Sequence, residues 1–138
     1  MQLKGEQKGI LELLSVGPDI QINSVQKLST IETPVLLVFG SSNCTASMRE
    51  VIKLLQYYPV WQAKKEVEVV YINLTLEEGL CKDVPWLTFC DFKGLKTQAA
   101  LDYFIKATPS YVLLDENKKI LVFPENLQQV DAWVTYKL

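Results

Sequence analysis

The feature that most constrains the fold is an apolar segment that passes through a short polar turn into an amphipathic helix. Residues 35–39 are apolar without alternation, the pattern of a strand buried on both faces. After the turn, apolar residues recur at helical spacing, and residues 67–72 form a second, β-branched run. A strand, a helix and a strand predict a right-handed βαβ unit with parallel strands. The predicted inward face of the helix is Met48, Val51, Ile52, Leu55 and Tyr58.

A single thiol at the start of that helix is the first candidate for chemistry. Ser42 and Asn43 are good N-cap residues, so the helix is expected to begin at or just before Cys44. Unpaired backbone N–H groups and the positive end of the helix dipole favour a thiolate there. Open α/β sheets place their sites after central strands, which makes Cys44 a candidate nucleophile. The alternative is a small residue that fills the helix start.

The rest of the chain predicts a mixed sheet with helices on both faces. Pro59 discourages continuation of the first helix, which is expected to end at about Tyr58. Residues 10–16 fit either a helical turn or a strand, within a lead-in over residues 1–16 that precedes one domain at 17–138. Further extended segments are expected at 20–22, 84–90, 110–114 and 120–123, and further helical ones at 28–31, 60–65, 97–105 and 127–136. The expected inward residues of the last two helices are Ala100, Leu101, Phe104, Leu127, Val130, Trp133 and Val134, with Thr97 as a cap.

The composition excludes several classes of function. The 138 residues include no histidine, which removes Ser-His-Asp and Cys-His catalysis and most zinc sites. The cysteines, Cys44, Cys81 and Cys90, lack metal-ligand spacing, and no cofactor is expected. The net charge is -2, so the chain lacks the excess of basic residues that is typical of nucleic-acid binding. No stretch approaches the roughly twenty apolar residues of a membrane span. Residues 1–9 lack the apolar core of a signal peptide, so the start fits either a mature chain or an excised domain.

Four segments follow, in order and spacing, the pattern of one protein family. Residues 17–20 (Gly-Pro-Asp-Ile) correspond to an opening PDF, and residues 39–50 (Phe-Gly-Ser-Ser-Asn-Cys-Thr-Ala-Ser-Met-Arg-Glu) align without a gap on FWASWCPPCRKE. Residues 85–94 correspond to the segment before the third helix, and residues 107–120 to a G(I/T)PT motif with its following hairpin. In these segments the chain resembles the TlpA/ResA-like thiol–disulfide oxidoreductases. The resemblance implies an α/β thioredoxin-like fold over residues 17–138, with a central mixed β-sheet flanked by helices on both faces.

The resemblance also implies roles for five residues. Cys44 matches the attacking cysteine of the CxxC motif, and Pro109 matches the cis-proline that lies against it. Thr108 would present backbone groups to a bound peptide. Glu50 matches an acidic proton acceptor near the thiols, where the alternative is a solvated helix face. Trp86 is the tryptophan expected to line a substrate groove near Cys44, where the alternative is core packing, as for the other two tryptophans.

The active-site motif departs from the family at its second cysteine. Ser47 stands in that position, so the motif reads Cys44-Thr-Ala-Ser47, a CxxS variant. A hydroxyl cannot attack a mixed disulfide and release the substrate, as a resolving thiolate does. Asn43 and Gly40 also stand where the family has tryptophans, which removes an apolar shield beside the nucleophile.

Two functions follow from this pattern. The first is a thiol–disulfide oxidoreductase that acts through Cys44 alone on protein or peptide disulfides and mixed disulfides, with another thiol completing the reaction. Whether Cys81 or Cys90 supplies that thiol stays open, as does a structural disulfide between them; Cys90 is expected to be a small buried core residue. The second is a redox-inactive module that binds a peptide beside Pro109. The resemblance implies a periplasmic or cell-envelope location; substrate and oligomeric state stay open.

Overall fold

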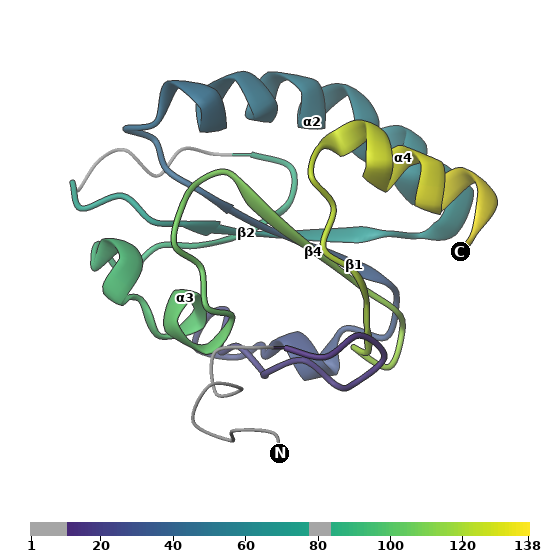
Figure 1. The fold of residues 1–138 in the computed structure, drawn as a ribbon, viewed down its shortest axis with the longest axis horizontal. Helices are drawn as coiled ribbons and strands as arrows, with labels where there is room; N and C mark the ends of the chain where they lie inside the picture. The colour runs from purple at the N-terminus through teal and green to yellow at the C-terminus, as the bar shows by residue number, and fades with distance from the viewer. Residues whose placement is uncertain (1–10, 78–83) are drawn as a thin grey trace, which may run out of the picture.

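The central strand β1 (Val35–Gly40) organises the sheet, as the apolar segment predicts. The computed structural model describes residues 11–77 and 84–138, and in these residues five strands pair in the order β3-β2-β1-β4-β5 (Figure 1). The strands that flank β1 are β2 (Glu68–Asn73), β3 (Leu87–Phe89), β4 (Ser110–Leu114) and β5 (Ile120–Val122). β2 runs parallel to β1 and β3 parallel to β2, whereas β4 runs antiparallel to β1 and β5 antiparallel to β4. The predicted parallel βαβ unit is therefore confirmed.

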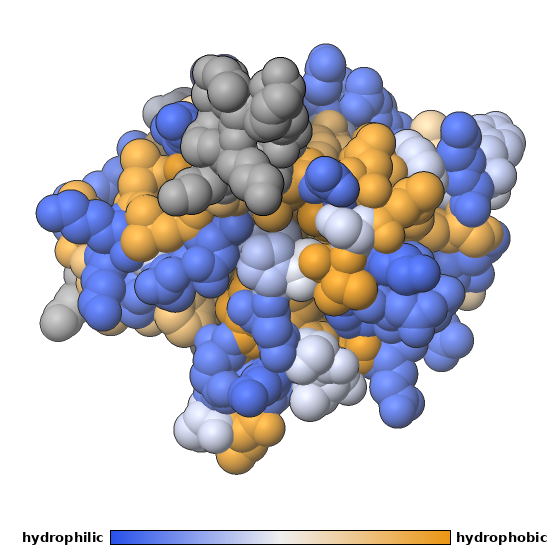
Figure 2. Space-filling model, turned by 60° about the horizontal axis from the view of Figure 1, so that its bottom comes forward, coloured by the Kyte–Doolittle hydropathy of each residue, from blue (hydrophilic) through white to orange (hydrophobic). Residues whose placement is uncertain are grey.

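Helices cover both faces of this sheet, which confirms the predicted fold class. The long helix α2 (Thr45–Lys65) and the last helix α4 (Leu127–Tyr136) lie together on one face. The short helix α3 (Gln98–Asp102) and the N-terminal region with the 3-10 turn η1 (Leu28–Thr30) lie on the other face (Figure 1). A second 3-10 turn, η2 (Gly94–Lys96), precedes α3. Figure 2 brings the side with α3 and the N-terminal region forward and shows hydrophobic patches interspersed with hydrophilic ones.

The two faces of β1 belong to two separate hydrophobic clusters. Val35, Leu37 and Phe39 pack toward α3 and the N-terminal region, whereas Leu36 and Val38 pack toward α2 and α4. All six residues of β1 are buried, which confirms the prediction of a strand covered on both faces.

Helix α2 is longer than predicted. It begins at Thr45, with Cys44 itself as the N-cap, and runs through Pro59 to Lys65. The predicted end at Tyr58 and the separate helix at 60–65 are wrong. Proline removes one backbone hydrogen bond from a helix, but Trp61, two residues further on, is fully buried and donates from Nε1 to Asp131 Oδ1 at 2.9 Å. Burial of this side chain keeps the helix continuous across the proline.

The predicted inward face of α2 is rotated from the true one. Ile52 and Leu55 are 63% and 45% exposed, so their predicted burial is wrong. The start of the helix at Thr45 and the burial of Trp61 in the core together decide which residues of the helix face the sheet. The buried residues of α2 are Ser47, Leu54, Tyr58 and Trp61.

Helix α3 is shorter than the predicted range of 97–105. Phe104 adopts a left-handed backbone conformation with a φ of 56°, which stops the helix before it. Leu101 is 51% exposed and Phe104 38% exposed, so both inward assignments are wrong, and Tyr103 is buried instead. Thr97 is at the N-cap position but makes no side-chain cap hydrogen bond; its hydroxyl donates to Asp91 Oδ1 at 2.7 Å.

The N-terminal region has less regular structure than predicted. Residue Val16 makes an isolated bridge with Lys119, and Gln21 makes one with Lys27, but no strand forms at 20–22. The helix at 127–136 and the strand at 110–114 have the predicted bounds, and Trp133 is half-buried at the edge of its helix.

Candidate active site

A network of polar contacts holds the turn between β1 and α2. The backbone N–H of Cys44 donates to the carbonyl oxygen of Ser41 at 3.0 Å. Asn73, at the end of β2, accepts from the backbone N–H of Ser42 at 3.3 Å and donates from Nδ2 to its hydroxyl at 2.9 Å. Thr75 donates to the side-chain oxygen of Asn43 at 3.2 Å. Polar side chains of the β2 loop therefore fix the turn that positions the sulfur.

The sulfur of Cys44 caps the helix that follows it. Sγ accepts from the backbone N–H of Ser47 at 3.5 Å and donates to the carbonyl oxygen of Thr108 at 3.7 Å. The side-chain hydroxyls of Ser47 and Thr108, followed by the backbone N–H of Ser47, lower the pKa of the Cys44 thiol to about 7, against a smaller opposing effect of burial. The side chain is half-buried, so the sulfur is within reach of solvent. The site can therefore supply a thiolate near neutral pH.

Ser47 is buried directly behind this sulfur. Its side chain is 1% exposed, and its Oγ makes no hydrogen bond within the described part of the chain. A hydroxyl rotates about its C–O bond, so the Ser47 proton can turn toward Sγ when the thiolate forms. This accounts for the leading effect of Ser47 on the pKa of Cys44. Ser47 thus stands in the place of the second cysteine, with a buried hydroxyl that lowers the pKa of Cys44.

The loop before β4 forms the opposite wall. The peptide bond between Thr108 and Pro109 is cis, and both residues are half-buried. A cavity of about 330 Å³ opens between this loop and Cys44. The residues that line it are Ser41, Asn43, Cys44, Leu74, Leu95, Lys106, Ala107 and Thr108. The structure therefore brings together Cys44, Ser47, Thr108 and Pro109.

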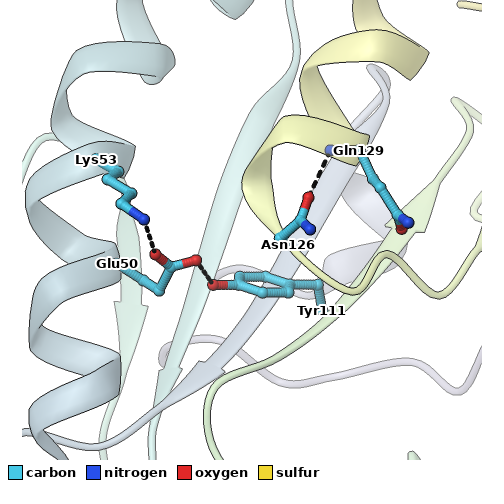
Figure 3. A network of polar contacts seen from close by, with 5 residues as sticks. All are labelled: Glu50, Lys53, Tyr111, Asn126 and Gln129. Atoms are coloured by element: carbon cyan, nitrogen blue, oxygen red, sulfur yellow. Dashed lines mark hydrogen bonds and ion pairs between the residues drawn. The ribbon is translucent and has the colours of Figure 1, made fainter.

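Glu50 lies one turn further along α2 and faces the sheet. Its Oε1 accepts from the hydroxyl of Tyr111 on β4 at 2.8 Å, and its Oε2 pairs with Lys53 Nζ at 3.2 Å (Figure 3). Its side chain is 17% exposed, so it does not lie on a fully solvated face. Burial, together with the Glu50 carboxylate, raises the pKa of Tyr111. Glu50 is therefore bonded to a phenol, and it makes no hydrogen bond to Cys44.

Tyr71 is a site residue that the sequence analysis missed. It lies opposite Val38 across β1 and β2, as Tyr111 does across β1 and β4, so the two phenols flank the same strand. A Cβ on Gly40 would lie 2.0 Å from the Tyr71 hydroxyl, which places that hydroxyl at the end of β1. Burial, followed by the nearby charge of Cys44, raises the pKa of Tyr71 to about 12. Strand alternation with the glycine at position 40 is the signal that could have identified it.

Trp86 does not line the cavity beside Cys44. It is 5% exposed and packs edge-on against Tyr58, with ring centroids 5.6 Å apart. It also stacks on Tyr71 at 6.3 Å, so it supports the phenol near the site from within the core. The packing alternative is the one that the structure supports for this residue.

Cys90 is disulfide-bonded, which is one of the alternatives that the sequence left open. It is half-buried, so its expected place as a small buried core residue is wrong. Cys81 lies outside the described residues. Across residues 11–77 and 84–138, Cys44 is the free cysteine, and no group of carboxylates and cysteines is arranged to hold a metal ion. No helix in that part of the chain is long and apolar enough to cross a membrane.

A capping cysteine after a central parallel strand, opposite a cis-prolyl loop, defines a protein of the thioredoxin-fold class. The sequence profile of the thioredoxin-like family matches residues 32–120. The chain therefore belongs to the thioredoxin-like family.

Solved structures share this fold over most of their length. The thioredoxin domain of a thiol-disulfide oxidoreductase from Bacteroides vulgatus is 20% identical, with a TM-score of 0.75 over 91% of this chain and 99% of that chain. A thiol:disulfide interchange protein from Bacteroides sp. is 20% identical, with a TM-score of 0.75 over 92% and 93%. A thiol-disulfide oxidoreductase from Bacteroides fragilis is 21% identical, with a TM-score of 0.70 over 80% and 85%. No curated protein sequence matches the chain.

Proposed function

We propose that this protein is a thiol–disulfide oxidoreductase that acts through the single nucleophile Cys44. The observation that carries the proposal is the capping position of its sulfur, where neighbouring donors lower the pKa of the thiol to about 7. The similar structures are those of thiol-disulfide oxidoreductases and an interchange protein, which supports the same class of reaction. The resemblance of residues 39–50 to the TlpA/ResA-like motif supports it independently.

The first step is thiol–disulfide exchange. The Cys44 thiolate attacks one sulfur of a protein or peptide disulfide, a new S–S bond forms, and the old one breaks. The released sulfur leaves as a thiolate and takes a proton from solvent. Ser47 cannot attack the mixed disulfide, so a second thiol from outside the motif must release the product. No cofactor is needed for either exchange.

The neighbours of Cys44 have distinct roles in this proposal. Ser47 donates to the thiolate both before attack and when Cys44 is the leaving group. Thr108 and Pro109 present backbone to an extended substrate segment. Glu50 holds Tyr111 in place beneath the site, which makes it a positioning residue; direct acceptance of the thiol proton is the alternative role that the resemblance implies.

The proposed location is the periplasm or cell envelope. The disulfide at Cys90 supports an oxidising compartment, because such bonds persist there and are rare in the cytosol. The resemblance to the TlpA/ResA-like family points to the same compartments.

An apolar groove favours a second function, peptide binding without redox turnover. A cavity of about 570 Å³ lies next to Pro109 and is lined by Phe104 and Phe123, which are 38% and 42% exposed. Exposed aromatic side chains beside an open loop can hold an apolar segment of a peptide. This module would need no reactive thiolate, which separates it from the first proposal.

Alkylation of Cys44 by iodoacetamide across pH distinguishes the two functions, with Cys44→Ala as the blank. An oxidoreductase requires a thiolate that titrates near 7, whereas a value at or above the roughly 8.5 of a free thiol supports the binding module. Insulin reduction with dithiothreitol or glutathione as the reductant then measures turnover. Normal titration without any reduction of insulin would limit the activity to smaller disulfides than insulin.

A further inference from the structure

Within the described residues, the reaction lacks an internal thiol to complete it. Across the described residues, Cys44 is the free cysteine, and the sulfur of Cys90 is already engaged in a disulfide. Ser47 occupies the position next to the nucleophile, where its buried hydroxyl has no partner except the sulfur that it can turn toward. The chain therefore stabilises the Cys44 thiolate as a leaving group but leaves the attack on the mixed disulfide to another molecule.

The cavity of about 330 Å³ beside Cys44, here called the Lys106 pocket, has room for a small molecule. Its volume lies near the lower limit of roughly 300 Å³ for small-molecule sites. Cys44 and Thr108 form one part of the lining, and Leu74 and Leu95 supply apolar surface. A molecule in this pocket contacts Cys44, whose sulfur must be released.

The charge of the pocket selects among such molecules. Among the described lining residues, Lys106 carries the one formal positive charge and none is acidic. Its ammonium makes no hydrogen bond or ion pair with the described part of the chain, and its side chain is exposed. The carboxylate of Glu77 accepts from Asn43 Nδ2 at 3.1 Å, and Glu77 is not among the residues that line the pocket. The pocket thus offers an unpaired cation to a ligand.

We propose that the Lys106 pocket receives a low-molecular-weight thiol with a carboxylate, which pairs with Lys106 while its sulfur resolves the Cys44 mixed disulfide. This inference rests on the proposed function, because it requires Cys44 to form that mixed disulfide. Lys106 lies three residues before Pro109, on the same loop that faces the sulfur, so one loop serves both the substrate and the small thiol.

The exchange balances with two small thiols for each substrate disulfide. The first thiolate attacks Cys44 Sγ, its new S–S bond forms, and the substrate leaves as a thiolate that takes a proton. A second small thiolate attacks the outer sulfur of the new mixed disulfide. Cys44 leaves as a thiolate stabilised by Ser47, and the two small thiols depart joined as one disulfide. The substrate disulfide is reduced to two thiols by the two electrons that the small thiols lose.

A charge series of thiols tests this assignment on the whole chain. Cys44 is first converted to its mixed disulfide with 2-thiopyridine, a neutral reporter, and release of 2-thiopyridone is followed by absorbance. The attacking thiols are 3-mercaptopropionate, 2-mercaptoethanol and cysteamine, which differ in the charge at the far end. Comparing wild type with Lys106→Gln for each thiol cancels its intrinsic nucleophilicity. At low salt, we expect Lys106→Gln to lower the rate of 2-thiopyridone release by 3-mercaptopropionate about threefold more than the rate with 2-mercaptoethanol. The rate with cysteamine should not fall.

Lys96→Gln is the matched control, because Lys96 is an exposed lysine of η2 next to Leu95 but does not line the pocket. Equal effects of Lys96→Gln and Lys106→Gln would assign the selectivity to the general field of the surface and overturn the proposal. Loss of the difference at high salt is expected for an exposed ion pair. If Cys44 reacts normally but shows no charge selectivity, only this inference fails. If Cys44 does not form the reporter disulfide in the wild type, the proposed function itself fails.

Discussion

The hydroxyl of Tyr111 on β4 donates to the carboxylate of Glu50 on α2 at 2.8 Å, and this bond ties the first long helix to the central sheet (Figure 3). Lys53 holds the other carboxylate oxygen at the surface. Glu50, the acidic residue of the motif, therefore joins α2 to β4. This role is separate from acceptance of the thiol proton.

We expect Tyr111→Phe and Glu50→Ala each to lower the free energy of unfolding by about 1–2 kcal/mol, because each leaves a partly buried polar group without its partner. The double variant should lose less than the sum, since one bond joins the two residues. Denaturant unfolding measures all three values. Iodoacetamide reactivity of Cys44 in Glu50→Gln separates the two roles of Glu50. An unchanged rate fits a positioning residue, whereas a large fall supports direct acceptance of the thiol proton.

Removing the hydroxyl behind the sulfur should weaken the nucleophile. We expect Ser47→Ala to raise the pKa of Cys44 from about 7 toward the roughly 8.5 of a free thiol and to slow alkylation about two- to fivefold at pH 7. Thr45→Ala is the control, because Thr45 is exposed and lies two residues before Ser47 on the same turn; it should leave the rate unchanged. An unaltered titration in Ser47→Ala would show that the helix terminus, without the Ser47 hydroxyl, sets the pKa of the Cys44 thiol.

Restoring a thiol at position 47 should change the reaction in a different way. We expect Ser47→Cys to raise insulin reduction several-fold, because the new thiolate can resolve the mixed disulfide within the chain. The variant should also lose its dependence on the charge of small thiols, since it no longer needs them. Absence of any gain would mean that the surrounding turn prevents the second sulfur from reaching the first.

The stability of the reduced protein should depend on the ionisation of Cys44. The pKa is about 7 in the folded chain and roughly 8.5 in the unfolded one, so the folded state loses its proton first. This contribution is fully present above pH 8.5, and it is lost as the pH falls through 7. Thermal unfolding of wild type and Cys44→Ala at pH 6 and pH 9 measures it: the difference between the two proteins should shift in favour of wild type at pH 9.

Gly40 should tolerate no side chain while Tyr71 is present. A Cβ at position 40 would lie 2.0 Å from the Tyr71 hydroxyl and 2.6 Å from the ring carbon that bears it. We expect Gly40→Ala to destabilise the fold by about 1–3 kcal/mol, as overpacking does in a well-packed core. Tyr71→Phe should relieve part of this cost, because the ring carbon remains. If Gly40→Ala is neutral, the Tyr71 hydroxyl does not occupy the end of β1.

Hydrophobic patterning determines much of this protein locally. The strands at 35–39, 67–72 and 110–114 and the helix at 127–136 follow from runs and spacings that depend on neighbouring residues. The placement of Cys44 at a helix start follows in the same way, because turn residues precede it. The family motif predicted Ser47, Thr108 and Pro109 as further site residues. Thr108 and Pro109 lie far from Ser47 in the chain and meet it only in the folded molecule.

Tertiary structure alone decided the remaining features. Which stripe of α2 faces the sheet, and whether the helix survives Pro59, depend on burial of Trp61 and its bond to α4. The partner of Glu50 lies on another element, β4, and Tyr71 and Tyr111 come together on either side of Val38 because the register of the whole sheet places them there. Helix propensities of ordinary residues differ by at most about 0.7 kcal/mol per residue, whereas full burial of a large apolar side chain is worth about 1.5–3 kcal/mol, so a long-range contact overrides an ordinary local preference. Pro59 costs more, about 3 kcal/mol, and there the burial of Trp61 acts together with its hydrogen bond to Asp131.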